Sequence, residues 1–185
     1  KGPSAKTFSI DLPPFTLIAA TTRTSLLSNP LRSRFGATFR LDYYKIEDIE
    51  KIIKRSAELL SIKIDPGAIT NLAKASRFTP RVANRLLKRS RDYAQVYKKE
   101  VIDEVVVKNI LAMLEIDDLG LEHTDRHLLD IIIKRFNGGP VGLKALGAAL
   151  NEDTGTIEEV YEPFLMSLGF LERTQLGRIA TNAAY

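Results

Sequence analysis

The sequence predicts three consecutive structural parts: an α/β segment, an all-α unit of four helices and a winged helix. Near the N-terminus, polar and apolar residues alternate at the period of a strand, and an unbroken apolar run follows at residues 15–20. From residue 45 to residue 116, apolar residues recur at helical spacing instead. The last third predicts three helices followed by two short strands, which is the order of elements in the winged helix-turn-helix.

The composition is that of a folded protein of one or two domains. Of its 185 residues, 44% are hydrophobic, which is enough for a core. The absence of cysteine excludes a disulfide framework and a thiolate metal site, and it fits a cytoplasmic protein. No apolar run reaches transmembrane length, and we expect no secretory signal. His123 and His127 lack the glutamate of a zinc-binding HExxH motif, so we expect exposed residues at a helix start and no metal site.

Charge is distributed unevenly along the chain. Residues 1–118 carry 21 Lys and Arg against 14 Asp and Glu, whereas residues 119–185 carry 6 against 9. A basic first part favours a phosphate-bearing partner.

Residues 6–20 and 39–44 are predicted to form strands of the first part. Residues 15–20 hold no charged position, which is typical of a parallel strand covered on both faces. Thr21 and Thr22 then fall at the carboxyl edge of the sheet, where ligands bind in open α/β folds. Their hydroxyls either contact a water or a phosphate there or cap the strand end.

Apolar stripes predict the helices that follow. Four stripes cover residues 46–60, 68–75, 82–93 and 106–114. Asp65-Pro66 and Thr79-Pro80 precede the second and third stripes, each as a capping oxygen followed by a proline suited to a first turn. After a linker at residues 117–120 we expect helices over 128–136, 143–150 and 156–168, and a hairpin with its tip at 174–177.

Three arginines of the first two parts are candidates for a phosphate ligand. Arg32 and Arg34 lie in a turn after the apolar strand, and guanidinium groups stay charged and donate hydrogen bonds in pairs. They are either solvated surface charges or groups presented to a nucleotide on a neighbouring subunit. Arg81 opens a helix, where the helix dipole disfavours a cation. It either serves a phosphate or begins a solvated basic face.

Arg173 and Arg178 flank the hairpin tip of the winged helix. A wing that reaches the DNA backbone is a common use of this fold, and a polar hairpin on a protein-binding module is the alternative. Glu158, Glu159 and Glu162 on the preceding helix are expected to repel phosphates. The sequence therefore predicts that the wing, and not the helix, contacts any bound DNA, without sequence-specific readout.

Several stretches together resemble the RuvB family, the ring-shaped AAA+ motors that drive branch migration of Holliday junctions with RuvA. The resemblance covers essentially the whole chain. The stretches that carry it are LPPFTLIAATTR, NPLRSRFG, LDYY, TPRVANRLLKRSRD, GGPVGLKALGAAL, TIEEVYEPFL and GFLERTQLGRIAT.

The resemblance implies ATP-related roles for five residues. Thr22 matches sensor 1, which monitors the γ-phosphate, and Arg34 matches an arginine finger that acts in trans. Tyr44 matches an aromatic residue beside the nucleotide. Pro80 and Arg81 match the sensor 2 motif, which reaches from the helical lid to the phosphates. The implied cofactors of the intact protein are ATP and Mg²⁺, with the Mg²⁺ ligands outside this chain.

The resemblance also implies domains and partners. Residues 1–44 match the end of the AAA+ ATPase core, residues 45–118 a helical lid and residues 119–185 a DNA-binding winged helix. Arg173 and Arg178 match wing positions that contact the DNA backbone. Residues 1–12 resemble the returning strand of a hairpin that binds RuvA. The implied assembly is a homohexameric ring that acts on Holliday junction and duplex DNA with RuvA, and with RuvC in the resolvase complex.

Three features depart from the family pattern. Phe78 stands where Arg-Gly-Thr-Pro-Arg usually has glycine, and Gln175-Leu176 stands where the wing usually has Pro-Arg. One wing cation is therefore missing, which predicts a smaller salt dependence of DNA binding. No phosphate-binding G-x-x-x-x-G-K-[ST] motif occurs in the 185 residues. We expect the nucleotide cradle to lie upstream of Lys1 and this chain alone to be inactive as an ATP hydrolase.

Two other readings fit part of the sequence. The chain is either an AAA+ replication initiator or clamp-loader relative, or a non-enzymatic winged-helix regulator whose first 118 residues dimerise. The regulator reading predicts tight binding to one duplex sequence.

Overall fold

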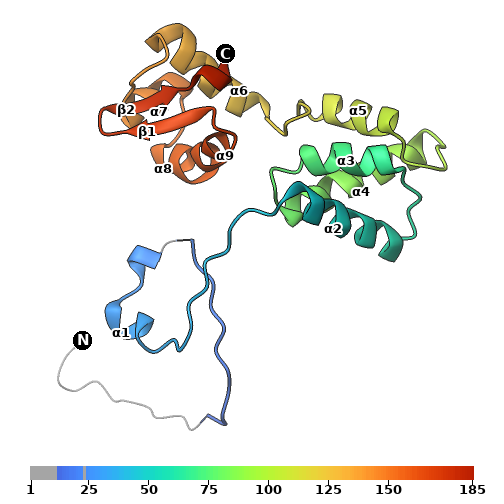
Figure 1. Ribbon diagram of the computed structural model, residues 1–185, viewed down its shortest axis with the longest axis horizontal. Coiled ribbons are helices and arrows are strands. Elements are labelled where there is room, and N and C mark those ends of the chain that lie inside the picture. The colour runs from blue at the N-terminus through green and yellow to red at the C-terminus, as the bar shows by residue number, and fades with distance from the viewer. Residues whose placement is uncertain (1–11, 23) are drawn as a thin grey trace. The chain divides into compact units, whose positions relative to one another are not determined.

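The computed structural model describes residues 12–22 and 24–185, and the chain divides into two compact units, Lys1–Leu41 and Asp42–Tyr185 (Figure 1). The described part of the first unit holds two short helical turns, η1 (Thr24–Leu26) and α1 (Asn29–Arg32). Pro30 lies in the first turn of α1, where its missing N–H costs nothing.

The strands predicted at residues 12–20 and 39–44 are not formed. These residues lack regular secondary structure, and apolar side chains among them, such as Ile18 (89% exposed) and Leu41 (91% exposed), face solvent. A strand needs a neighbour whose N–H and C=O groups complete its ladder. Within the described residues, the only strands longer than an isolated bridge are those of the C-terminal hairpin. The rest of the predicted N-terminal pattern, and with it most of the RuvA-binding strand predicted at 1–12, lies outside the described residues.

The four helices predicted between residues 45 and 116 are confirmed. They are α2 (Ile46–Leu59), α3 (Pro66–Lys74), α4 (Pro80–Val96) and α5 (Glu104–Met113), and Figure 1 shows them packed side by side. Their apolar faces meet in one core, in which Ile53, Leu72 and Leu87 are fully buried. A parallel bridge between Ile64 and Ile102 joins the loops before α3 and α5.

The ends of these helices follow the predicted caps in part. The Thr79 hydroxyl accepts a hydrogen bond from the Val82 N–H at 3.4 Å, as an N-cap should. Asp65 occupies the N-cap position of α3, but its carboxylate makes no capping bond. Asp103 caps α5, because its Oδ1 accepts a bond from the Val106 N–H at 2.8 Å.

The C-terminal part is a winged helix with its own core, which includes Leu128, Leu146 and Phe164. The predicted hairpin is confirmed: β1 and β2 pair antiparallel, and Thr174 lies opposite Gly177 across a two-residue tip. The elements are α6 (His123–Asp130), η2 (Ile131–Arg135), α7 (Leu143–Leu150), α8 (Thr154–Thr156), η3 (Ile157–Tyr161), α9 (Glu162–Ser167), β1 (Leu171–Thr174), β2 (Gly177–Ala180) and η4 (Asn182–Ala184).

The helix predicted over residues 156–168 is interrupted. A π-helical turn, η3, separates α8 from α9. Pro163 explains the interruption, because proline has no N–H to donate and its ring clashes with the carbonyl of the residue four positions earlier. The widened turn at η3 absorbs that conflict just before α9.

The helix predicted over residues 128–136 begins earlier, at His123, and its last turn is the π-helical η2. His123 and His127 are exposed on α6, as predicted. Among residues 12–22 and 24–185, no cluster of three or more potential metal ligands occurs. None of the helices described is both long enough and apolar enough to span a membrane.

Two backbone hydrogen bonds to Val141 hold β2 at Arg178. Its N–H donates to the Val141 carbonyl at 2.8 Å, and its carbonyl accepts from the Val141 N–H at 2.9 Å. Gly177 has a φ of +142°, and a Cβ there would lie 2.5 Å from the Val141 carbonyl oxygen. Only glycine fits this approach, so the base of the wing has a defined position.

Asp65 and Asp103 both occupy N-cap positions, but only Asp103 makes a capping bond, so the pair gives a matched test. We expect Asp103→Ala to lower the free energy of unfolding by about 1 kcal/mol, because the Val106 N–H loses its acceptor. Asp65→Ala removes a carboxylate that makes no capping bond and should cost clearly less. Urea unfolding followed by circular dichroism measures both, and equal losses would contradict the assignment.

Candidate functional site

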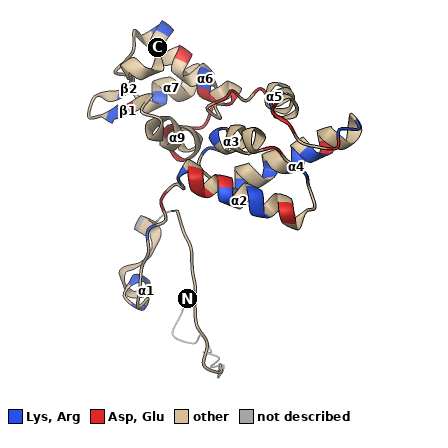
Figure 2. Cartoon of the chain, turned by 45° about the vertical axis from the view of Figure 1, so that its right-hand side comes forward, with Lys and Arg blue, Asp and Glu red and all other residues tan. Residues whose placement is uncertain are grey.

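The two wing arginines lie directly opposite each other, Arg173 on β1 and Arg178 on β2. Residues that pair across an antiparallel sheet point to the same face. Both side chains reach Glu162, the first residue of α9 (the hairpin and α9 are labelled in Figure 2).

Glu162 is fully buried and accepts hydrogen bonds from both guanidinium groups. Arg173 donates to Oε2 through Nε at 3.1 Å and also through Nη2. Arg178 donates through Nε to Oε1 at 2.7 Å and through Nη2 to Oε2 at 3.4 Å. The same Nη2 donates to Glu158 Oε1 at 2.9 Å. Two cations therefore compensate one buried carboxylate and one half-exposed carboxylate.

This arrangement corrects one expectation. Glu162 does not face solvent and repel phosphates, because its charge is buried and paired with Arg173 and Arg178. Glu158 is also paired. The helix is less acidic at its surface than its sequence suggests. The i, i+4 spacing of Glu158 and Glu162 was a signal for this cluster, since it places both carboxylates on one helix face.

The two arginines differ in what they leave accessible. The Arg178 side chain is 11% exposed and the Arg173 side chain 44% exposed. Burial lowers the pKa of Arg178, but its hydrogen bond and charge interaction with Glu162, and then those with Glu158, outweigh burial and raise that pKa overall. Arg178 is held as an internal counter-ion, whereas the more exposed Arg173 bonds to Glu162 through Nε and Nη2 and leaves Nη1 for a ligand.

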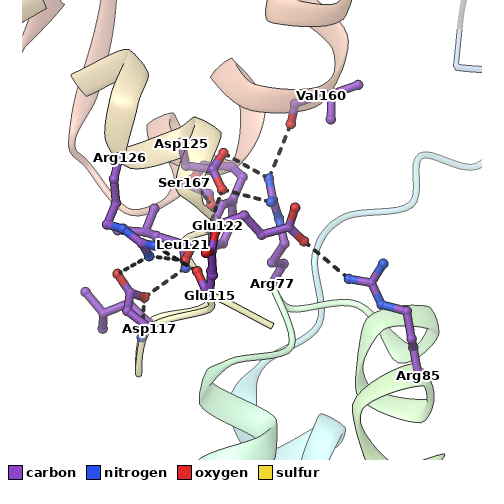
Figure 3. Close-up of polar contacts among 12 residues, drawn as sticks. Arg77, Arg85, Glu115, Asp117, Leu121, Glu122, Asp125, Arg126, Val160 and Ser167 are labelled. Atoms are coloured by element: carbon purple, nitrogen blue, oxygen red, sulfur yellow. Dashed lines mark hydrogen bonds and ion pairs between the residues drawn. The ribbon is translucent and has the colours of Figure 1, made fainter. Parts of the chain in front are cut away.

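Arg77 connects the four-helix unit to the winged helix (Figure 3). Its Nη1 donates to Asp125 Oδ2 at 2.9 Å, and its Nη2 donates to Asp125 Oδ1 at 3.4 Å and to the Val160 carbonyl at 3.5 Å. Its guanidinium carbon lies 4.2 Å from the centre of the Phe164 ring. Because Asp125 is fully buried, this contact is shielded from water.

Two more contacts support the same junction. Arg85 on α4 pairs with Glu122 at 3.3 Å. Arg126 donates to the carbonyls of Leu121 at 2.6 Å and Glu115 at 2.8 Å, which ties α6 to the residues on both sides of the linker (Figure 3). The acidic surplus of the winged helix is thus partly compensated by arginines of the four-helix unit.

Two groups of the winged helix have raised pKa values. Burial raises the pKa of Asp125, although the Glu122 N–H and the charge of Arg77 act in the opposite direction. The contribution of this carboxyl to stability is therefore greatest below its unfolded pKa and falls as pH rises through the raised value. Burial, followed by the charge of Glu152, raises the pKa of Tyr161.

The residues predicted to act on ATP fall into both units. Thr22 and Arg34 are exposed in the first unit, and the Arg34 N–H donates to the Leu31 carbonyl at 3.1 Å just after α1. The neighbouring Arg32 bonds instead to Asn29 Oδ1 at 2.7 Å. Among the described residues, Arg34 has no ion-pair partner.

Tyr44, Pro80 and Arg81 lie in the second unit. Tyr44 is 48% exposed, and its N–H donates to the Phe78 carbonyl at 3.1 Å. Pro80 and Arg81 are the first two residues of α4. Arg81 is exposed, and no residue in the described part of the chain pairs with its guanidinium. The contact through Phe78 therefore brings Tyr44 to the segment that leads into α4.

Three family models match consecutive parts of the chain. The Holliday junction DNA helicase RuvB P-loop domain matches residues 1–41, the RuvB AAA lid domain residues 44–117 and the RuvB C-terminal winged helix domain residues 118–185. The Holliday junction branch migration complex subunit RuvB of Koribacter versatilis is 55% identical over all 185 residues, which span 51% of that protein.

Solved structures agree with these matches. The Thermotoga maritima RuvB Holliday junction branch migration motor has a TM-score of 0.86 and 50% identity over 93% of this chain and 58% of that one. A proline-to-glycine mutant of the same protein has a TM-score of 0.87 and 49% identity over 95% of this chain and 59% of that one. The chain spans between half and three fifths of the length of these relatives.

The buried carboxylate predicts unequal effects of the two wing arginines on stability. We expect Arg178→Ala to lower the free energy of unfolding by about 3 kcal/mol, because Glu162 loses its better-buried counter-ion. Arg173→Ala should cost less, since that side chain is already 44% exposed. Urea unfolding measures both.

A second substitution provides the control. Adding Glu162→Gln to the Arg178→Ala variant removes a buried charge that only Arg173 still compensates, and should recover part of the loss. If the free energy of unfolding of Arg178→Ala equals that of the wild-type protein, the role given to the ion pair is wrong.

Proposed function

The chain belongs to the RuvB family, and we propose that it forms the C-terminal part of a branch migration motor subunit. It supplies the end of the ATPase core, the helical lid and a winged helix to a hexameric ring. The observation that carries this proposal is the 55% identity, over the whole chain, to a branch migration complex subunit. The ring uses ATP and Mg²⁺ to pump duplex DNA at a Holliday junction in recombination and repair. It works in the cytoplasm with RuvA, and with RuvC during resolution.

The spacing of residues substituted in a relative supports the alignment behind the nucleotide roles. Solved mutants of Thermotoga maritima RuvB replace a threonine, an arginine and a proline. That arginine follows the threonine by 12 residues, and the proline follows the arginine by 46 residues. Thr22, Arg34 and Pro80 repeat these residue types at the same spacing. The match supports the alignment of Thr22, Arg34 and Pro80 with the family positions on which the implied roles rest.

The proposed reaction is hydrolysis of ATP, in which this chain supplies electrostatic groups. Charge spreads over the equatorial phosphate oxygens in the transition state, and a guanidinium stabilises it. Arg34 does so at the site of the neighbouring subunit, and Thr22 monitors the γ-phosphate. Arg81 contacts the phosphates from the lid, and Tyr44 lies beside the nucleotide. Arg34 and Arg81 suit these roles, because both are exposed and neither pairs with another described residue.

The nucleotide cradle and the Mg²⁺ ligands are assigned to the half of the subunit outside this chain. Among the 185 residues there is no phosphate-binding G-x-x-x-x-G-K-[ST] motif. We therefore propose that this chain alone does not hydrolyse ATP.

DNA contact is proposed for the wing. Arg173 contributes its accessible guanidinium to the DNA backbone, and Arg178 holds Glu162 so that the hairpin keeps its position. The direct contact predicted for Arg178 remains a prediction. The wing tip itself carries Gln175 and the 81% exposed Leu176 and adds no cation. Such contacts to phosphates are independent of sequence and weaken with salt.

Binding of this chain to a labelled four-way junction and to plain duplex, over a salt series, tests the wing. We expect weak binding without sequence preference. Arg173→Ala should reduce the log–log salt slope by about one unit. Lys51→Ala, which removes an exposed cation from lid helix α2, is the matched control and should leave the slope unchanged. Tight binding to one duplex sequence would favour a winged-helix regulator instead.

Mixed rings of the intact motor test the action of Arg34 in trans. Arg34→Ala should lower the rate of ATP hydrolysis by roughly 10³-fold or more, and Arg81→Ala should also lower it. A subunit with Arg34→Ala keeps its own Arg81 and can receive Arg34 from a neighbour that carries Arg81→Ala. Mixing the two variants should therefore restore part of the rate.

The control for the mixed rings is Arg32→Ala, which removes the adjacent arginine that bonds to Asn29. It should retain most of the rate. Mixed rings as inactive as each variant alone would show that Arg34 does not act across the interface.

A further inference from the structure

Phe78 adopts a backbone conformation that large side chains rarely take. Its φ is +55°, and that of the preceding Arg77 is +53°. A bulky residue in the left-handed region is an outlier, which persists only where the surrounding structure holds it. The contacts of Phe78 should therefore show what this segment is for.

The Phe78 ring lies between two aromatic residues from different parts of the chain. Its centre is 6.3 Å from that of Tyr43, in an edge-to-face arrangement, and 6.2 Å from that of Phe164. Phe164 belongs to the core of the winged helix and is 2% exposed. Phe78, a residue of the lid, thus packs against the winged-helix core while holding the segment that enters the lid.

The backbone of Phe78 makes a second contact with the same entering segment. Its carbonyl accepts the Tyr44 N–H at 3.1 Å. Thr79, the next residue, caps α4, and Arg81 lies in the first turn of that helix. Tyr44 and Arg81, the two residues of the second unit proposed to contact the nucleotide, are therefore both tied to Phe78.

Arg77 holds the other side of this arrangement. Its guanidinium stacks on the ring of Phe164 at 4.2 Å and binds the buried carboxylate of Asp125 through both terminal nitrogens. Phe164 is thus contacted by two consecutive lid residues, one through a cation and one through a ring. Charge and aromatic packing together fix the lid segment to the winged helix.

We propose that Phe78 is a positioning residue for nucleotide binding. It holds Tyr44 and the start of α4 in place by packing on Phe164, so the nucleotide contacts of the lid depend on the core of the winged helix. This inference rests on the proposed function, because it takes Tyr44 and Arg81 as nucleotide contacts. The winged helix and the ATP site are then linked through the contact of Phe78 with Phe164, beside the contacts that Arg77 makes.

Nucleotide affinity of the intact motor provides the first test. Phe78→Gly removes the ring and suits the left-handed backbone, so it should not unfold the lid. We expect it to weaken binding of a fluorescent ADP analogue about three- to tenfold, the range of one or two lost aromatic contacts. Phe78→Tyr keeps the ring and should bind the ADP analogue as tightly as the wild-type protein. DNA binding by the winged helix should be unchanged in both variants.

Amide hydrogen exchange provides the second test, without nucleotide. In Phe78→Gly and in Phe164→Leu, the Tyr44 amide should exchange at least about threefold faster, because the carbonyl that accepts its bond is no longer held. Amides in the middle of α2, such as that of Ile53, should be unaffected and report that the lid is folded. Unchanged exchange of Tyr44 in Phe78→Gly would overturn the proposal, even if Phe164→Leu unfolds the winged helix.

Tyr44→Ala and Arg81→Ala separate this inference from the proposed function. If they weaken ADP binding but Phe78→Gly does not, the positioning role is wrong and the proposed function stands. If neither of them changes ADP binding, the nucleotide roles of Tyr44 and Arg81 are wrong. If Phe78→Gly weakens ADP binding and Phe78→Tyr restores it, with faster exchange of Tyr44, the positioning role is supported.

Discussion

The buried carboxylate of Glu162 is the constraint on which the wing depends. A charge without water is costly unless cations and hydrogen bonds compensate it, and here Arg173 and Arg178 do so from two neighbouring strands. A two-stranded hairpin is marginally stable by itself. Its attachment to α9 through this carboxylate, and to Val141 through the backbone of Arg178, gives it a fixed position. The two arginines that the sequence predicts to contact DNA therefore also compensate the buried charge of Glu162.

A similar pairing joins the lid to the winged helix. The sequence has a basic first part and an acidic last part, and two arginines of the lid meet two carboxylates of the winged helix at their junction. Part of the charge asymmetry is thus used inside the chain rather than at a partner. Arg34 and Arg81 are different, since they pair with no other described residue and keep their full capacity for a phosphate. This difference separates structural arginines from those available to a ligand.

Most of the helical structure was predictable because its signals are local. The helix α7 covers the predicted residues 143–150, and Thr79 forms the predicted cap of α4. The failures have non-local or competing causes. Residues 15–20 form no strand, since a strand requires a neighbour to complete its hydrogen bonds. The π-helical turn η3 follows from Pro163, which interrupts an otherwise helical apolar pattern.

The sequence by itself determined the order of the helices, the position of the hairpin and the family, because periodicity, caps and motifs are read along the chain. Only the tertiary structure decided what each charged side chain does. Arg77 binds Asp125 across 48 positions, and Arg178 binds Glu162 across 16. Whether an arginine is a buried counter-ion or an accessible donor depends on the partners that folding brings within about 3 Å of it, and that distance is not encoded in the spacing of residues along the chain.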